Sequence, residues 1–259
     1  MAEIITTIKS FALAFAGGVI PSFVWLWFWR REDRACPEPT GLVALSFVAG
    51  MVVVFFVLPI EKLIVVTLPT MMHLVDILAG KLSLVTPPDL TIRTLLWAFA
   101  EEFAKYATVF LIAFHTRDFD EPVDAVIYLI TAALGFAAME NSLYILKDIG
   151  GSDGVQIFLD GHLRFLGATV LHTASSAFVG IALAFSFYAA GWIKFITITL
   201  GLIIATLLHT YFNLSIIEAH GTMSTLAVFA RYWGVIMFII VLFEIIKYTH
   251  KDKKSCTII

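Results

Sequence analysis

The sequence predicts an all-α integral membrane protein, a polytopic transmembrane helix bundle with about seven or eight spans forming a single domain over residues 1–259. Of the 259 residues, 60% are hydrophobic and only 14% are charged, and the mean hydropathy is +0.93. Soluble domains are roughly 45–50% apolar, because a chain of this size has too little interior to bury more. The apolar residues also gather in long stretches, and a helix needs about 20 such residues to cross a bilayer.

Eight apolar segments follow one another along the chain and give the expected helices in order. They cover residues 4–29, 41–60, 63–80, 93–114, 123–146, 163–189, 192–217 and 232–247. The first segment ends in Trp25, Trp27 and Trp29, which is typical of the aromatic belt at a membrane–water interface. All segments except 63–80 are interpreted as complete spans.

Segment 63–80 is the weakest, because Pro69, His73 and Asp76 interrupt it. It is interpreted as a short helix, a re-entrant segment or a tilted span. If it does not cross completely, the chain has seven spans and its basic residues gather on one side, which is then the cytoplasmic side. These residues are Arg30, Arg31, Arg34, Arg117, Lys194, Lys247, Lys251, Lys253 and Lys254. We therefore expect the N-terminus outside the cell and the C-terminus in the cytoplasm.

Composition also narrows the function. The net charge is −3 and no basic patch with interleaved aromatic residues is present, so we expect no nucleic-acid partner. Cys36 and Cys256 are far apart and match no metal-binding or disulfide spacing. The N-terminus lacks a basic region and a cleavage site, so residues 10–29 are expected to remain as the first helix.

The most informative charges lie inside a span. Glu101, Glu102 and Lys105 occupy the centre of segment 93–114, where each charge costs roughly 2.5–3.5 kcal/mol on insertion scales. Glu101 and Lys105 are one helical turn apart, and Glu102 lies about 100° round the helix. Such a cluster must face the interior of a bundle, either as a structural ion pair that fixes helix packing or as a functional site.

Three later segments carry further polar groups in apolar surroundings, and they favour the functional interpretation. Glu140 follows Phe136 by about one turn and precedes Asn141, His172 precedes Ser176 by four residues, and His209 precedes Asn213 by four. A single such residue is often only an interhelical hydrogen bonder. Together they have the chemistry of water-activated hydrolysis, in which a carboxylate takes a proton from water and delivers it to the leaving amine. No serine-nucleophile motif is present, and no cysteine lies in a span.

These motifs resemble the PrsW family of bacterial intramembrane proteases, within the larger CPBP/Abi glutamic protease group. The resemblance covers residues 93–217, the expected protease core, and rests on Glu-Glu-x-x-Lys at 101–105, the stretch 124–141, the His172 helix and His-x-x-x-Asn at 209–213. It implies an endopeptidase in the bacterial cell membrane that makes the first cut in a single-span substrate, an anti-sigma factor. It also implies that the catalytic set is Glu101, Glu102, Glu140, His172, His209 and Asn213, supported by Lys105, Phe136, Asn141 and Ser176.

Within this set we expect Glu101 to be the general base, because Lys105 lies one turn away and can tune it. Glu102 would share its proton with help from His172, while His209 and Asn213 would stabilise the oxyanion. Zinc could be held by the two histidines and a glutamate, but a metal-free mechanism is favoured, because Lys105 would compete with a cation for Glu101.

Three alternative functions remain: a CaaX prenyl endopeptidase, a proton-coupled transporter using the glutamates as a relay, and an inactive relative that binds membrane partners.

Overall fold

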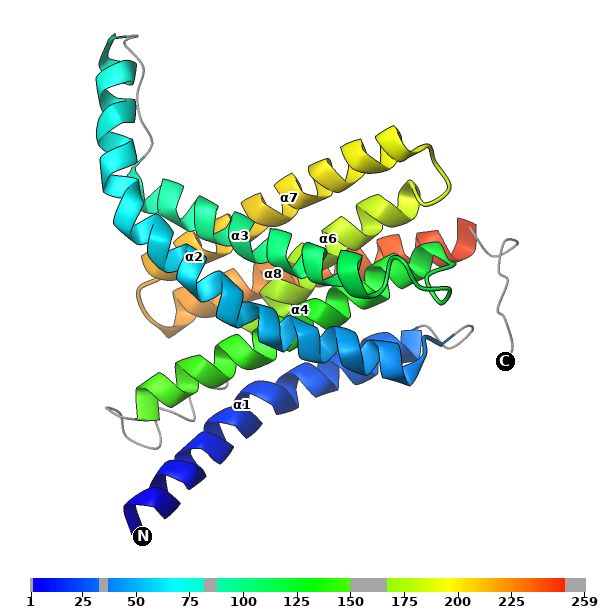
Figure 1. Ribbon diagram of the computed structural model, residues 1–259, viewed down its shortest axis with the longest axis horizontal. Coiled ribbons are helices and arrows are strands. Elements are labelled where there is room, and N and C mark those ends of the chain that lie inside the picture. Colours follow the sequence, from blue (N-terminus) through cyan, green and yellow to red (C-terminus); the bar gives the residue numbers. More distant parts are fainter. Residues whose placement is uncertain (1, 33–36, 82–87, 150–166, 250–259) are drawn as a thin grey trace.

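The computed structural model describes residues 2–32, 37–81, 88–149 and 167–249, and every regular element within these ranges is an α-helix, which confirms the all-α prediction (Figure 1). Arg34, both cysteines and the lysines beyond Thr249 lie outside the described residues. The helices are α1 (Ala2–Glu32), α2 (Thr40–Lys81), α3 (Asp89–Ile112), α4 (Pro122–Ile149), α6 (Ala168–Phe185), α7 (Gly191–Glu218) and α8 (Thr222–Thr249).

The helices form a polytopic bundle, as predicted. Within the described ranges, six helices are long and apolar enough to cross a membrane, namely α1, α2, α4, α6, α7 and α8. Helix α3 has 24 residues, but its three central charges make it less apolar than the others. It packs against α2, α4, α6 and α7 inside the bundle, where these charges are shielded from lipid.

Segments 41–60 and 63–80 are one continuous helix, α2, which corrects the prediction that they are separate. Pro59 and Pro69 lie inside this helix, and each removes one backbone hydrogen bond and favours a bend. The C-terminal part of α2 turns away from the bundle in Figure 1. The indole of Trp97 on α3 donates a hydrogen bond of 3.2 Å to the carbonyl oxygen of Glu61, which fastens α2 to α3 between the two prolines.

Helix α4 is the centre of the bundle, because every residue from Pro122 to Ala138 is buried and α1, α2 and α6 pack along the helix. The crossing with α2 is especially close. A Cβ added to Gly50 would collide with the carbonyl of Ala132, and one added to Gly135 would collide with the carbonyl of Phe47. Small residues allow transmembrane helices to approach in this way. The crossing fixes the depth of Phe136 and Glu140, which follow Gly135 on α4.

Consecutive helices run in opposite directions (Figure 1). One end of the bundle therefore contains the C-terminal ends of α1, α3, α6 and α8, together with the starts of α2, α4 and α7. The described basic residues on which the orientation prediction rests belong to this end: Arg30, Arg31, Arg117, Lys194 and Lys247.

Candidate active site

The structure brings the carboxylates and histidines of α3, α4, α6 and α7 into one buried cluster. Lys105 is at its centre and is completely buried. Its ammonium donates hydrogen bonds to Glu102 Oε1 at 2.7 Å and to His172 Nδ1 at 2.8 Å. The same ammonium lies 4.5 Å from the centre of the Phe136 ring, a cation–π contact.

Lys105 lies closer to Glu102 than to Glu101, the carboxylate that we expected it to tune. The distance from Lys105 Nζ to Glu101 Oε2 is 3.7 Å, against 2.7 Å to Glu102. Glu102 Oε1 also lies 2.9 Å from His209 Nδ1, and Glu102 Oε2 accepts a hydrogen bond of 3.0 Å from Ser176 Oγ. Because both of its oxygens are engaged, Glu102 holds its neighbours in position.

The carboxylate of Glu101 differs from that of Glu102, because one of its oxygens has no hydrogen bond within the described ranges. Its Oε2 is buried and has no hydrogen-bond partner among the described residues. This oxygen lies 3.8 Å from His172 Nδ1 and 3.8 Å from His209 Nε2. Buried polar atoms are almost always hydrogen-bonded, so a carboxylate oxygen that lacks a hydrogen bond and faces two imidazoles points to a group that binds or reacts there.

Each histidine is held by a carboxylate on one ring nitrogen and turns the other towards Glu101. His172 Nε2 lies 2.6 Å from Glu140 Oε2, and His209 Nδ1 is held by Glu102. The two rings meet edge to face, with 5.2 Å between their centroids. A carboxylate on the far nitrogen fixes both the tautomer and the orientation of a histidine, as is usual for metal ligands.

These residues fit a divalent metal ion. Glu101, His172 and His209 each offer one ligand atom, and the three atoms lie within 4.8 Å of one another. Three nitrogen and oxygen ligands with a remaining open position are the usual set of a catalytic zinc site. Lys105 lies beside two of these ligands, because its ammonium is 3.7 Å from Glu101 Oε2 and hydrogen-bonds to His172 Nδ1, which it must release before that nitrogen can bind a metal.

Two predicted residues stand apart from this network. Asn213 lies one turn beyond His209 on α7 and is half-buried, and its side chain makes no hydrogen bond with the described part of the cluster. Asn141 is buried and donates a hydrogen bond of 3.2 Å to Thr169 Oγ1, which joins α4 to α6. The structure therefore gives Asn141 a contact between helices, whereas the role of Asn213 at an oxyanion remains a prediction.

Sequence reasoning missed Glu61. This half-buried residue of α2 lies beside the carboxylates of Glu101 and Glu140, close enough for its charge to interact with both. It escaped notice because Pro59 and Lys62 made this part of the chain look like a break between two segments. An acidic residue within the apolar run from Val57 to Val66 was the available signal.

Comparison with known proteins decides the family. A family model described as "PrsW family intramembrane metalloprotease" matches residues 38–244. This chain belongs to the PrsW family. The match extends beyond residues 93–217, on which the sequence resemblance rested, and takes in α2 with Glu61 as well as all the helices of the cluster.

Three curated proteins named Protease PrsW are similar to this member of the PrsW family. The one from Geobacillus kaustophilus is 28% identical over 51% of this chain and 52% of its own length. The one from Bacillus subtilis is 25% identical over 75% of this chain and 78% of its own length, and the one from Halalkalibacterium halodurans is 30% identical over 35% and 37%. The chain thus spans about half the length of the first of these relatives. No solved structure matches it.

Proposed function

We propose that this PrsW-family chain is an intramembrane endopeptidase that hydrolyses a peptide bond of a membrane-anchored protein. The observation that carries the proposal is the buried Oε2 of Glu101, which has no hydrogen-bond partner among the described residues and faces two histidines that are each held by a carboxylate. Charges buried among spans are costly, so a cluster of this size is expected where it performs chemistry. Hydrolysis needs water, and the side chain of Glu140, which is 35% exposed, lies at the open side of the cluster.

We propose that Glu101, His172 and His209 hold a divalent metal ion. Such an ion supplies activation of water and polarisation of the scissile carbonyl. Glu102 and Glu140 keep the two imidazoles in position through His209 Nδ1 and His172 Nε2. Glu61 and Glu140 are the partly exposed carboxylates beside the ligands, and they are placed to accept a proton from water and return it to the leaving amine.

The substrate class that we propose is a single-span membrane protein, an anti-sigma factor on the resemblance to PrsW-type proteases. The test is reconstitution of the purified chain in lipid vesicles with candidate single-span proteins, followed by mass mapping of the products. Cleavage within or next to the span supports the proposal. Cleavage confined to soluble unfolded proteins, or no cleavage of any membrane-anchored candidate, contradicts it.

Chelation distinguishes the metal-assisted mechanism from the metal-free one favoured by the sequence. We expect exhaustive chelation to abolish cleavage and one equivalent of zinc to restore it, with elemental analysis showing one metal per chain. His209→Ala should lose the bound metal, whereas His220→Ala should keep it, because His220 lies in the exposed turn between α7 and α8. Full activity in metal-free protein would return Glu101 to the role of general base.

We propose that the C-terminus is cytoplasmic, because the basic residues gather at the end of the bundle where α8 finishes. The cluster then lies towards the opposite face, since Glu140 is late in α4, His172 is early in α6 and His209 is late in α7. A reporter that is active only in the cytoplasm, fused after Lys254, should be active. Activity of a periplasmic reporter at the same point would reverse the orientation.

A further inference from the structure

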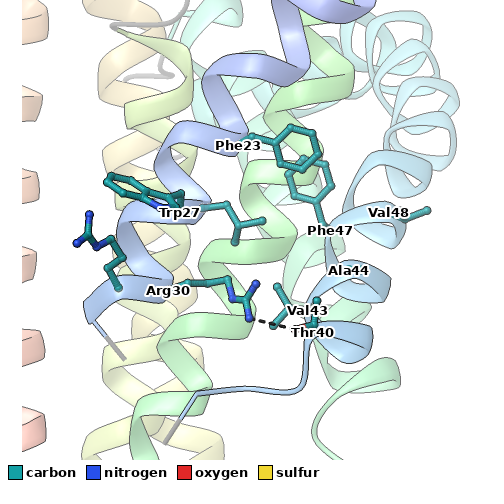
Figure 2. Close-up of a pocket in the computed structure, with 10 residues that line it drawn as sticks. Phe23, Trp27, Arg30, Thr40, Val43, Ala44, Phe47 and Val48 are labelled. Atoms are coloured by element: carbon teal, nitrogen blue, oxygen red, sulfur yellow. Dashed lines mark hydrogen bonds between the residues drawn. The ribbon is translucent and has the colours of Figure 1, made fainter. Parts of the chain in front are cut away.

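A groove lies between α1 and α2 at the end of the bundle opposite the catalytic cluster. Both helices pack along α4 and meet each other through the stacked rings of Phe23 and Phe47 and through Arg30 and Thr40, and a cavity of about 530 Å³ lies between these contacts (Figure 2). Its floor is formed by the buried side chains of Leu26, Val43 and Phe47. Its walls are apolar and exposed on the surface that faces lipid, and they include Phe23, Trp27 and Val48.

Two arginines lie at the mouth of this groove. The guanidinium of Arg30 crosses from α1 to α2 and donates a hydrogen bond of 3.2 Å to Thr40 Oγ1 (Figure 2). The guanidinium of Arg31 lies 4.4 Å from the centre of the Trp27 ring. Within the described ranges, neither arginine pairs with a carboxylate, whereas the nearby Glu32 is matched by Lys247. Among the described residues, no carboxylate therefore neutralises either guanidinium group, and both carry donors that suit an anion.

We propose that the groove between α1 and α2 binds one anionic phospholipid. Its phosphate would lie against Arg30 and Arg31, since guanidinium groups bind phosphate oxygens in a bidentate manner. One acyl chain would occupy the apolar part of the groove beside Phe23 and Ala44. The volume falls in the range of roughly 300–1,000 Å³ that is usual for ligand pockets, and a free phosphate ion would leave the apolar part unused.

The position along the membrane normal agrees with this occupant. The groove begins next to Trp25, Trp27 and Trp29, and tryptophan is enriched at the level of the lipid headgroups. With the C-terminus in the cytoplasm, this level belongs to the inner leaflet, where anionic lipids attract basic residues near the membrane surface. The proposed site uses none of the residues of the catalytic cluster, so it is a separate property of the chain.

Native mass spectrometry of the full chain in detergent, titrated with phosphatidylglycerol or phosphatidylcholine of the same acyl chains, tests this proposal. We expect one phosphatidylglycerol to bind about tenfold more tightly than phosphatidylcholine. The double variant Arg30→Gln/Arg31→Gln should lose this preference. The matched control Arg117→Gln/Lys194→Gln removes two basic residues from the same end of the bundle and should keep it.

A second variant separates a specific groove from general attraction to basic residues. Ala44→Trp leaves both arginines in place but fills the apolar part, and Ala44 is exposed, so the larger side chain does not disturb the core. We expect it to weaken phosphatidylglycerol binding about as much as loss of the arginines does, with thermal unfolding unchanged. Equal effects of the arginine variant and its control, no effect of Ala44→Trp, or displacement of the lipid by millimolar inorganic phosphate would overturn the proposal.

Discussion

Glu101→Gln is expected to reduce cleavage by about 10²–10⁴-fold while the protein stays folded. The substitution keeps the size of the side chain but removes the charge of the oxygen that faces His172 and His209. This loss follows whether Glu101 binds a metal or acts as a base, so the result tests the position of the reaction centre and does not depend on the mechanism. The measurement is the initial rate of cleavage of a reconstituted single-span substrate.

Stability separates this functional role from a structural one. A buried carboxylate oxygen without a hydrogen bond is unfavourable for folding, so the melting temperature of Glu101→Gln should equal or exceed that of the natural chain. Glu218→Gln is the matched control, because Glu218 is exposed at the end of α7 and should affect neither quantity. A variant that melts early and loses activity in proportion would indicate a structural ion pair at Glu101.

The sequence was sufficient to find most of the cluster, because the cost of burying charge in a membrane is a local and readable signal. Glu101, Glu102 and Lys105 could not face lipid, and His172, His209 and Glu140 stood out against the apolar segments around them. The helix positions were equally readable, since a span must satisfy its backbone hydrogen bonds internally and therefore needs a long apolar stretch. The order of the motifs along the chain then indicated the family.

What the sequence could not provide were the contacts that depend on neighbouring helices. The spacings of Glu101 and Glu102 to Lys105 both allow an ion pair, and the choice is made by His172, which binds the lysine from α6. The position of Glu61 is likewise supported from another helix, because Trp97 of α3 hydrogen-bonds to its carbonyl oxygen next to the apparent break in α2. Both contacts join residues that are far apart in the sequence, so no local sequence pattern predicts them.

Lys105→Met should have the largest effect on folding of any substitution in the cluster. Methionine fills nearly the same space, but the change leaves Glu102 as a buried charge without its main partner, and removal of one member of a buried pair costs about 3–5 kcal/mol. Ser176 and His209 still contact Glu102, but neither supplies a permanent positive charge. Chemical unfolding in mixed micelles, compared with the exposed control Lys62→Met, measures this loss.

The double variant Lys105→Met/Glu102→Gln tests whether the stability lost in Lys105→Met comes from the unpaired carboxylate of Glu102. If the penalty arises from the uncompensated carboxylate, neutralising Glu102 should restore more than half of the stability lost in Lys105→Met, a coupling that a double-mutant cycle detects directly. Activity should not return, because His209 would have lost the carboxylate that orients it. Stable Lys105→Met protein without activity would instead make the lysine a participant in the reaction, with Glu102 held in place by its other two partners alone.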